Sequence, residues 1–183
     1  AYTCFKRPSS MKHIVPLTLI AIVAAAFLIR IVGVSTIPPG VNRDEASIGY
    51  TAYSLLKTGK DEYGIAWPIS FRSFGDWKLP LYIYLTIPSV TLFGLNEFSV
   101  RFPSVVFGTA TVVVTYFLVH YLFPKTRLLA LLSSLLLAIS PWHIHFSRVG
   151  SEANVAVFLT TLGLVLFFAS RFCPWLLVFS SVF

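Results

Sequence analysis

Two adjacent carboxylates follow the first apolar segment of the chain and are the first candidates for chemistry. Asp44 and Glu45 lie in the stretch Asn42-Arg43-Asp44-Glu45. Asn42 followed three residues later by Glu45 is a capping-box pattern, and Asp44 in the first turn would complement the helix dipole. A carboxylate at a membrane surface also suits a general base where a lipid substrate meets an aqueous one. The residues alone leave both interpretations open.

Two basic residues stand where apolar segments begin. Lys78 lies in Lys78-Leu79-Pro80, and Arg101 lies in Val100-Arg101-Phe102-Pro103-Ser104. An ammonium at headgroup depth can bind a lipid phosphate as a point charge, and a guanidinium can bind it through two hydrogen bonds. The alternatives are a lysine that snorkels to the headgroups and an arginine that anchors a helix in the interface.

A second polar segment interrupts the later apolar runs. Pro141 is expected to break the helix there, and a helix resumes beyond Gly150. Arg148 and Glu152 stand four residues apart, a spacing that suits an intrahelical ion pair. His143 and His145 lie two apart with no third ligand nearby, which favours interface histidines over a metal site.

The helix expected to carry the acidic pair is amphipathic and lies on the membrane surface. It runs from Asn42 to Gly59. Its apolar positions follow a helical period, and they are Ile48, Ala52, Leu55 and Leu56.

Composition identifies the class of protein that must position these residues. Of 183 residues, 56% are hydrophobic and 11% charged, against about 25% in soluble domains, and the mean hydropathy is +0.80. Apolar runs near 20 residues are close to the length that crosses a ~30 Å hydrocarbon layer, so an ordinary soluble enzyme and a nucleic-acid binder are both excluded. The net charge of +7 therefore indicates membrane topology. Cys4 and Cys173 have neither a disulfide framework nor metal-ligand spacing.

The apolar runs predict an all-α, multi-spanning membrane protein. The first run is too long for a secretory signal, and Arg30 near its end is expected to snorkel to the headgroups. We expect residues 1–10 to lie upstream of the natural start at Met11, and the chain to be the N-terminal part of a longer protein. The predicted membrane helices are 14–33, 102–123, 128–142 and 153–170, joined by cytoplasmic segments 1–13 and 124–127 and outer segments 34–101 and 143–152, with 171–183 starting a further, truncated helix.

The segment 79–95 leaves two topologies open. It holds Pro80 and Pro88, and if it spans, Lys125 and Arg127 fall outside. If it lies in the outer interface or is re-entrant, every acid falls outside and the basic residues sort to the inside, which the positive-inside rule favours. The acids are Asp44, Glu45, Asp61, Glu62, Asp76, Glu97 and Glu152, and the inside basic residues are Lys6, Arg7, Lys12, Lys125, Arg127 and Arg171.

Four motifs, in this order along the chain, resemble bacterial family 39 glycosyltransferases of the GT-C fold. They are RDEASIGYTAYSLLKTGKDEYG, FRSFGDWKLPLYIYLTIPSV, FGLNEFSVRFPSVVFGTATVVVTYFL and LLAISPWHIHFSRVGSEANVAVF. The family is related to protein O-mannosyltransferases and to the aminoarabinose transferase that modifies lipid A. The resemblance implies a catalytic acid at Asp44-Glu45 and a donor-phosphate contact at Lys78. Arg101 matches the family's R-L-P-S stretch with Phe in place of Leu, and Glu152 is the candidate second-loop acid, with Arg148 beside it.

The resemblance implies a hexosyl or pentosyl transferase in the bacterial plasma membrane with its active site on the outer face. It would move a sugar, with inversion, from a polyprenyl phosphate to a protein, lipid or polysaccharide acceptor. No cofactor is certain. A divalent metal held by Asp44 and Glu152 stays open. The alternatives are a non-catalytic fragment and a transporter segment, although only Arg30 and His120 are ionisable groups within the membrane helices.

Overall fold

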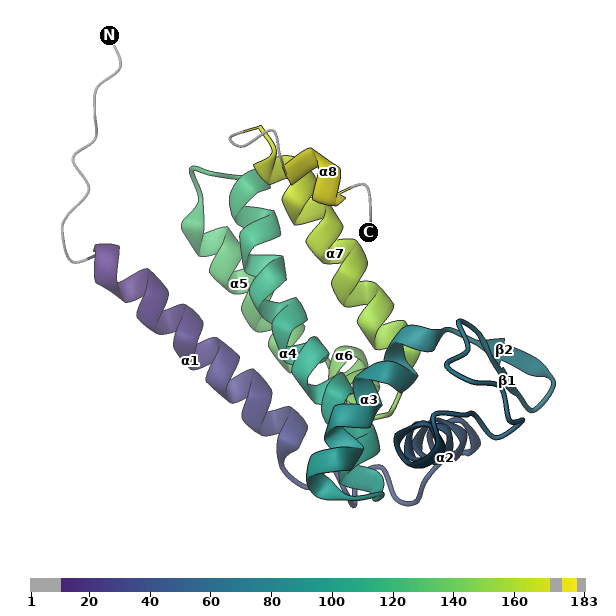
Figure 1. Cartoon of the computed structure of the whole chain (residues 1–183). Coiled ribbons are helices and arrows are strands. Elements are labelled where there is room, and N and C mark those ends of the chain that lie inside the picture. The colour runs from purple at the N-terminus through teal and green to yellow at the C-terminus, as the bar shows by residue number, and fades with distance from the viewer. Residues whose placement is uncertain (1–10, 172–175, 181–183) are drawn as a thin grey trace, which may run out of the picture.

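The computed structural model describes residues 11–171 and 176–180, and its long helices form one bundle (Figure 1). The predictions about residues 1–10, Cys4 and Cys173 lie outside the described residues. The central helix is α4, which contacts α1, α5 and α7 along the bundle. The bounds are Met11–Ile31 for α1, Glu97–Leu122 for α4, Arg127–Ile139 for α5, Pro141–Ser147 for α6, Glu152–Ala169 for α7 and Leu176–Ser180 for α8.

The lengths and apolar character of the helices confirm the all-α membrane class. Both α4 and α7 are long and apolar enough to cross a membrane. The helices α5 and α6, bent by 61° at the break before Pro141, make a third span if the pair is taken as one. Shorter apolar helices are Val15–Ile31, within α1, and Pro80–Phe93, which is α3. Helix α4 starts five residues before the predicted 102, because Asn96 and Ser99 form a capping box there.

The segment between α1 and α4 gathers at one end of the bundle (Figure 1). It holds α2 (Arg43–Thr58), a short antiparallel hairpin of β1 (Phe71–Ser73) and β2 (Asp76–Lys78), and α3. The hairpin was not predicted. Its register pairs Phe71 with Lys78, so the buried end of β1 lies beside the residue that the sequence marks for phosphate binding.

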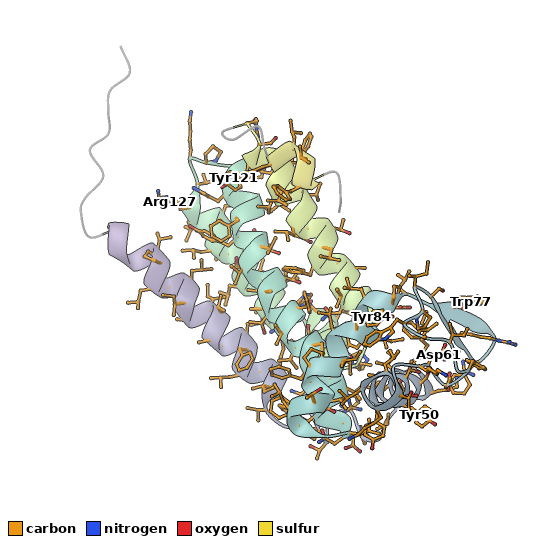
Figure 2. All side chains as sticks on the ribbon, viewed as in Figure 1. Tyr50, Asp61, Trp77, Tyr84, Tyr121 and Arg127 are labelled. Carbon is orange, nitrogen blue, oxygen red and sulfur yellow. The ribbon has the colours of Figure 1, made fainter. Side chains whose placement is uncertain are left out.

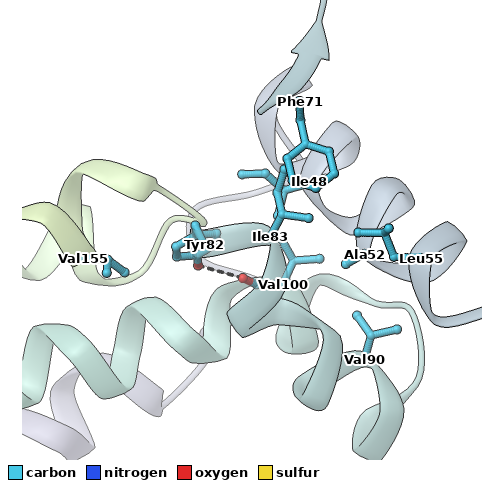
Figure 3. Packing of buried hydrophobic residues seen from close by; sticks show 9 residues of the cluster. All are labelled: Ile48, Ala52, Leu55, Phe71, Tyr82, Ile83, Val90, Val100 and Val155. Carbon is cyan, nitrogen blue, oxygen red and sulfur yellow. Dashed lines mark hydrogen bonds between the residues drawn. The ribbon is translucent and has the colours of Figure 1, made fainter. Parts of the chain in front are cut away.

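Helix α2 is amphipathic, as the sequence predicts, and its capping box is present. The Asn42 side chain accepts from the Glu45 N–H, and the Glu45 carboxylate accepts from the Asn42 N–H. Its apolar residues pack with Phe71 of β1 and Ile83 of α3 in one core, which Figure 3 shows. One assignment was wrong: Leu56 is 36% exposed, because Leu55 already fills the buried position at that turn.

Helix α3 crosses the first turns of α4 at this same end. Near its start, the Tyr82 hydroxyl donates to the Val100 carbonyl at 2.8 Å (Figure 3). Near its end, the Phe93 ring packs edge-on against Phe98 at 5.0 Å between centroids. Both ends of α3 therefore contact residues 98–104. Its 14 residues give a length of about 21 Å, short of a ~30 Å hydrocarbon core.

Candidate active site

An open cleft of about 570 Å³ lies where the α1–α2 loop, the start of α2, the end of β2 and the α6–α7 turn meet. Of the six site residues predicted from the sequence, Asp44, Glu45, Lys78 and Glu152 line it. Four residues from three distant parts of the chain are thus brought to one cleft. Arg101 and Arg148 are not among its lining residues.

Packing between α2 and the hairpin places Lys78 beside Asp44. Phe71 is buried in the core, and the hydroxyls of Ser47 and Ser73 are 2.8 Å apart, so β1 is fixed to α2. Lys78 Nζ consequently reaches Asp44 Oδ1 at 3.0 Å and also donates to the Asp44 carbonyl. The lysine side chain is 10% exposed and the aspartate 63% exposed. Asp44 therefore presents an open carboxylate, and a nearly buried cation lies next to it.

Glu45, unlike the exposed Asp44, is buried: it is 1% exposed, and both its oxygens accept hydrogen bonds. Oε1 accepts from Arg101 Nε and from the Gly150 N–H, each at 2.8 Å. Oε2 accepts from Arg101 Nη2 at 3.0 Å and from the Asn42 N–H at 3.1 Å. Burial alone would raise the pKa of Glu45, but the hydrogen bonds from Arg101, Gly150 and Asn42 hold it below its ordinary value.

Arg101 is also fully engaged inside the protein. It is 1% exposed, and besides Glu45 its guanidinium donates to three carbonyls of the α1–α2 loop. These are the carbonyls of Val34, Pro38 and Gly40. Arg101 thus joins the start of α4 to Glu45 and to the loop that forms one wall of the cleft.

The α6–α7 turn brings Glu152 to the cleft and turns Arg148 away from it. Glu152 begins α7, and its Oε2 accepts from the Leu79 N–H at 2.9 Å. The interpretation of Arg148 and Glu152 as an intrahelical ion pair is wrong, because α6 ends at Ser147 and α7 begins at Glu152, so the two residues do not share a helix. Arg148 donates to main-chain carbonyls at the end of α1 instead.

Arg30 is the basic residue that sequence reasoning misplaced. The prediction that it snorkels to the headgroups was wrong, since it is 0% exposed. It donates to the Ala26 and Ala138 carbonyls, and its Nη2 lies 2.8 Å from His143 Nδ1. Its surroundings come from α5 and α6, which no local pattern around residue 30 reveals.

Asp76 and His145 line the cleft but were not predicted as site residues. Asp76 stands two residues before Lys78 on β2, so a prediction of the hairpin would have made Asp76 a candidate site residue as well. Within the described parts of the chain, no group of three or more His, Cys, Asp and Glu residues is placed to hold a metal ion.

Comparison with known proteins gives one match. A family model described as dolichyl-phosphate-mannose-protein mannosyltransferase matches residues 78–179, more than half of the chain. The match starts at Lys78 and includes Arg101, Arg148 and Glu152, whereas Asp44 and Glu45 precede it. Searches of curated proteins and of solved structures gave no match.

Proposed function

Because the chain belongs to the dolichyl-phosphate-mannose-protein mannosyltransferase family, we propose that it moves a sugar from a polyprenyl phosphate to an acceptor hydroxyl at the outer surface of a bacterial plasma membrane. The observation that carries this proposal is the pairing of Asp44 with Lys78 in the cleft. A solvent-accessible carboxylate and an ammonium 3.0 Å apart supply the two charges that such a transfer uses.

In the proposed reaction Asp44 is the general base and Lys78 meets the donor phosphate. The acceptor oxygen bonds to the anomeric carbon while the bond from that carbon to the phosphate oxygen breaks. The hydroxyl proton goes to Asp44, and polyprenyl phosphate leaves with the bonding electrons. The Lys78 ammonium stabilises the negative charge that grows on the phosphate. Direct displacement inverts the anomeric centre.

The contacts of Glu45 support Asp44, rather than Glu45, as the base. A base needs a free lone pair within reach of the acceptor hydroxyl. Both oxygens of Glu45 already accept two hydrogen bonds each, and its pKa is lowered, so its affinity for a proton is reduced. Glu45 and Arg101 are therefore assigned to holding the cleft in shape, and Glu152 to its opposite wall.

The distribution of charge along the bundle supports an outer-face site. The seven acids lie in α2, the loop and hairpin that follow it, and the first residues of α4 and α7. Lys125, Arg127 and Arg171 lie at the opposite end, and Figure 2 shows Asp61 and Arg127 at the two ends. Basic residues in short loops favour the cytoplasm, so the cleft is assigned to the outer side. The acceptor is a protein, a lipid or a polysaccharide.

The test is a transfer assay with polyprenyl-phosphate sugars on the purified, intact protein. Asp44→Asn keeps the size of the side chain and leaves the capping box of Asn42 and Glu45 intact, so the free energy of unfolding is expected to fall by about 1 kcal/mol or less. Turnover is expected to fall ~10²- to 10⁴-fold, with little change in donor KM. Glu62→Gln, at an exposed acid in the loop after α2, is the matched control and should keep its activity. Near wild-type turnover for Asp44→Asn would refute its role as base.

Lys78→Ala gives a second, different signature. Because the ammonium is proposed to contact the donor phosphate before reaction as well as during it, both donor KM and turnover should worsen. Lys57→Ala, which removes an exposed lysine at the end of α2, is the control. An unchanged donor KM for Lys78→Ala would refute the proposed contact between Lys78 and the donor phosphate.

A further inference from the structure

Arg148 is a buried charged residue whose guanidinium donates to main-chain carbonyls. It is 9% exposed, and no carboxylate within the described part of the chain pairs with it. Its three nitrogens all donate to main-chain carbonyls: Nη1 to Ile29 at 2.6 Å, Nη2 to Val32 at 2.8 Å and Nε to Ile37 at 3.2 Å. Each nitrogen thus donates a hydrogen bond to the main chain, and Arg148 is not among the residues that line the cleft.

The carbonyls that Arg148 binds lie at the end of α1 and in the loop beyond it. The last carbonyls of a helix have no partner within the helix and carry partial negative charge. Helix α1 ends at Ile31, so the carbonyl of Ile29 is one of these groups. Arg148 thus donates a hydrogen bond to this helix end and adds a positive charge beside that of Arg30, which stands in the last turn of α1.

Arg148 lies directly before the residues of the α6–α7 turn that contact the cleft. Two residues later, the Gly150 N–H donates to Glu45, and four residues later Glu152 lines the cleft. At the other end of its bonds, Ile37 directly precedes residues 38–42, which form the facing wall. One side chain therefore joins the two walls of the cleft.

Arg30 fixes the other end of α6 by the same kind of contact. It extends from α1 to the last carbonyls of α5, those of Leu137 and Ala138, and its Nη2 contacts His143 in α6. Helix α6 is thus tied to α1 through His143 near its start and through Arg148 at its end. The 61° bend before α6 is consequently held from both sides.

We propose that Arg148 is a positioning residue that locks the α6–α7 turn to the α1–α2 loop and so sets the distance between the Asp44 and Glu152 sides of the cleft. The kinetic part of this inference rests on the proposed transfer reaction. The lock itself does not, because it concerns only how the loop is held.

The lock is tested first without any activity measurement. Val34 lies in the α1–α2 loop and is 1% exposed, so a cysteine there reports opening of the loop. The background carries Cys4→Ser and Cys173→Ser together with Val34→Cys. With Arg148→Gln, the rate of labelling by a water-soluble thiol reagent is expected to rise about tenfold or more, since hydrogen bonds from a charged group are among the stronger ones. Arg148→Lys keeps the charge but not the three-way geometry, and should give a smaller rise.

Arg171→Gln is the matched control, because Arg171 is an exposed arginine that follows α7 at the other end of the bundle. Its labelling rate at position 34 should equal that of the parent. An Arg148→Gln rate equal to this control would overturn the lock, whatever the enzyme does.

The second arm is kinetic. A displacement near 1 Å at a reacting group can cost on the order of 100-fold in rate, so Arg148→Gln should lower kcat by about that factor and leave donor KM unchanged. Faster labelling with an unchanged kcat would show that the lock does not position the site. A parent protein that transfers no sugar from any polyprenyl phosphate would instead refute the proposed function, and labelling alone would then decide the lock.

Discussion

Glu45→Gln is expected to destabilise the protein strongly although it hardly changes the volume of the side chain. Glu45 and Arg101 are each 1% exposed. Arg101 donates from Nε to Glu45 Oε1 at 2.8 Å and from Nη2 to Glu45 Oε2 at 3.0 Å. Removing one partner of a buried ion pair leaves the other charge without compensation and costs about 3–5 kcal/mol. The glutamine amide also turns an NH₂ group toward N–H donors, those of Arg101 and Asn42 in one orientation and those of Arg101 and Gly150 in the other. We therefore expect a loss of unfolding free energy within that range.

The assay is equilibrium unfolding of the purified protein in detergent. Glu62→Gln, on the exposed loop after α2, serves as the control and should stay within about 0.5 kcal/mol of the parent. A double variant, Glu45→Gln with Arg101→Met, removes both charges and should lose less than the sum of the two single variants. A loss below about 1 kcal/mol for Glu45→Gln alone would refute the assignment of Glu45 to the structure of the site.

The same pair predicts how stability depends on pH. The pKa of Glu45 lies below its ordinary value: burial raises it, but the hydrogen bonds from Arg101, Gly150 and Asn42 outweigh burial. For an acid with a depressed folded-state pKa, the stabilisation is complete above the unfolded pKa, about 4.3 for Glu, and is lost as pH falls through the folded value. The difference in unfolding free energy between the parent and Glu45→Gln should therefore be constant near neutral pH and shrink below about pH 4. A difference that does not change with pH would contradict this account.

Two further predictions test the packing and the topology. Gly108→Ala should lower the unfolding free energy by about 1–3 kcal/mol in the same assay, because the added Cβ would lie 2.6 Å from Ser147 Cβ of α6. An unchanged stability would show that α4 and α6 can separate at little cost. Single cysteines are placed at Ser35 and Lys125 in a background without Cys4 and Cys173, and an impermeant reagent added from outside should label position 35 only. Labelling of position 125 from outside would place a complete crossing at 79–95.

Local patterns predicted the elements whose signals are local. Asn42 and Glu45 predicted the start of α2, and the long apolar runs predicted α4 and α7. The hairpin escaped prediction because its strands have three residues each and its turn is Phe74-Gly75 rather than Asn-Gly. Phe74 has a φ of +49°, which is uncommon for a non-glycine residue. A phenylalanine at this position therefore does not indicate a turn.

The three buried arginines show why the rest of the site was beyond sequence reasoning. Arg30 and Arg101 stand near the ends of apolar segments, which favours a place at the membrane interface, whereas the spacing of Arg148 and Glu152 suits an intrahelical ion pair. Their main partners are carbonyls of residues 26–40 and 137–138, and a carbonyl is present in every residue, so no side-chain pattern marks it. Only the path of the chain decides whether such an arginine meets a lipid phosphate or a helix end. Where an interrupted helix such as α5–α6 or an irregular loop such as 32–42 lies nearby, unpaired carbonyls compete with the lipid for the guanidinium, and in this chain the carbonyls bind all three arginines.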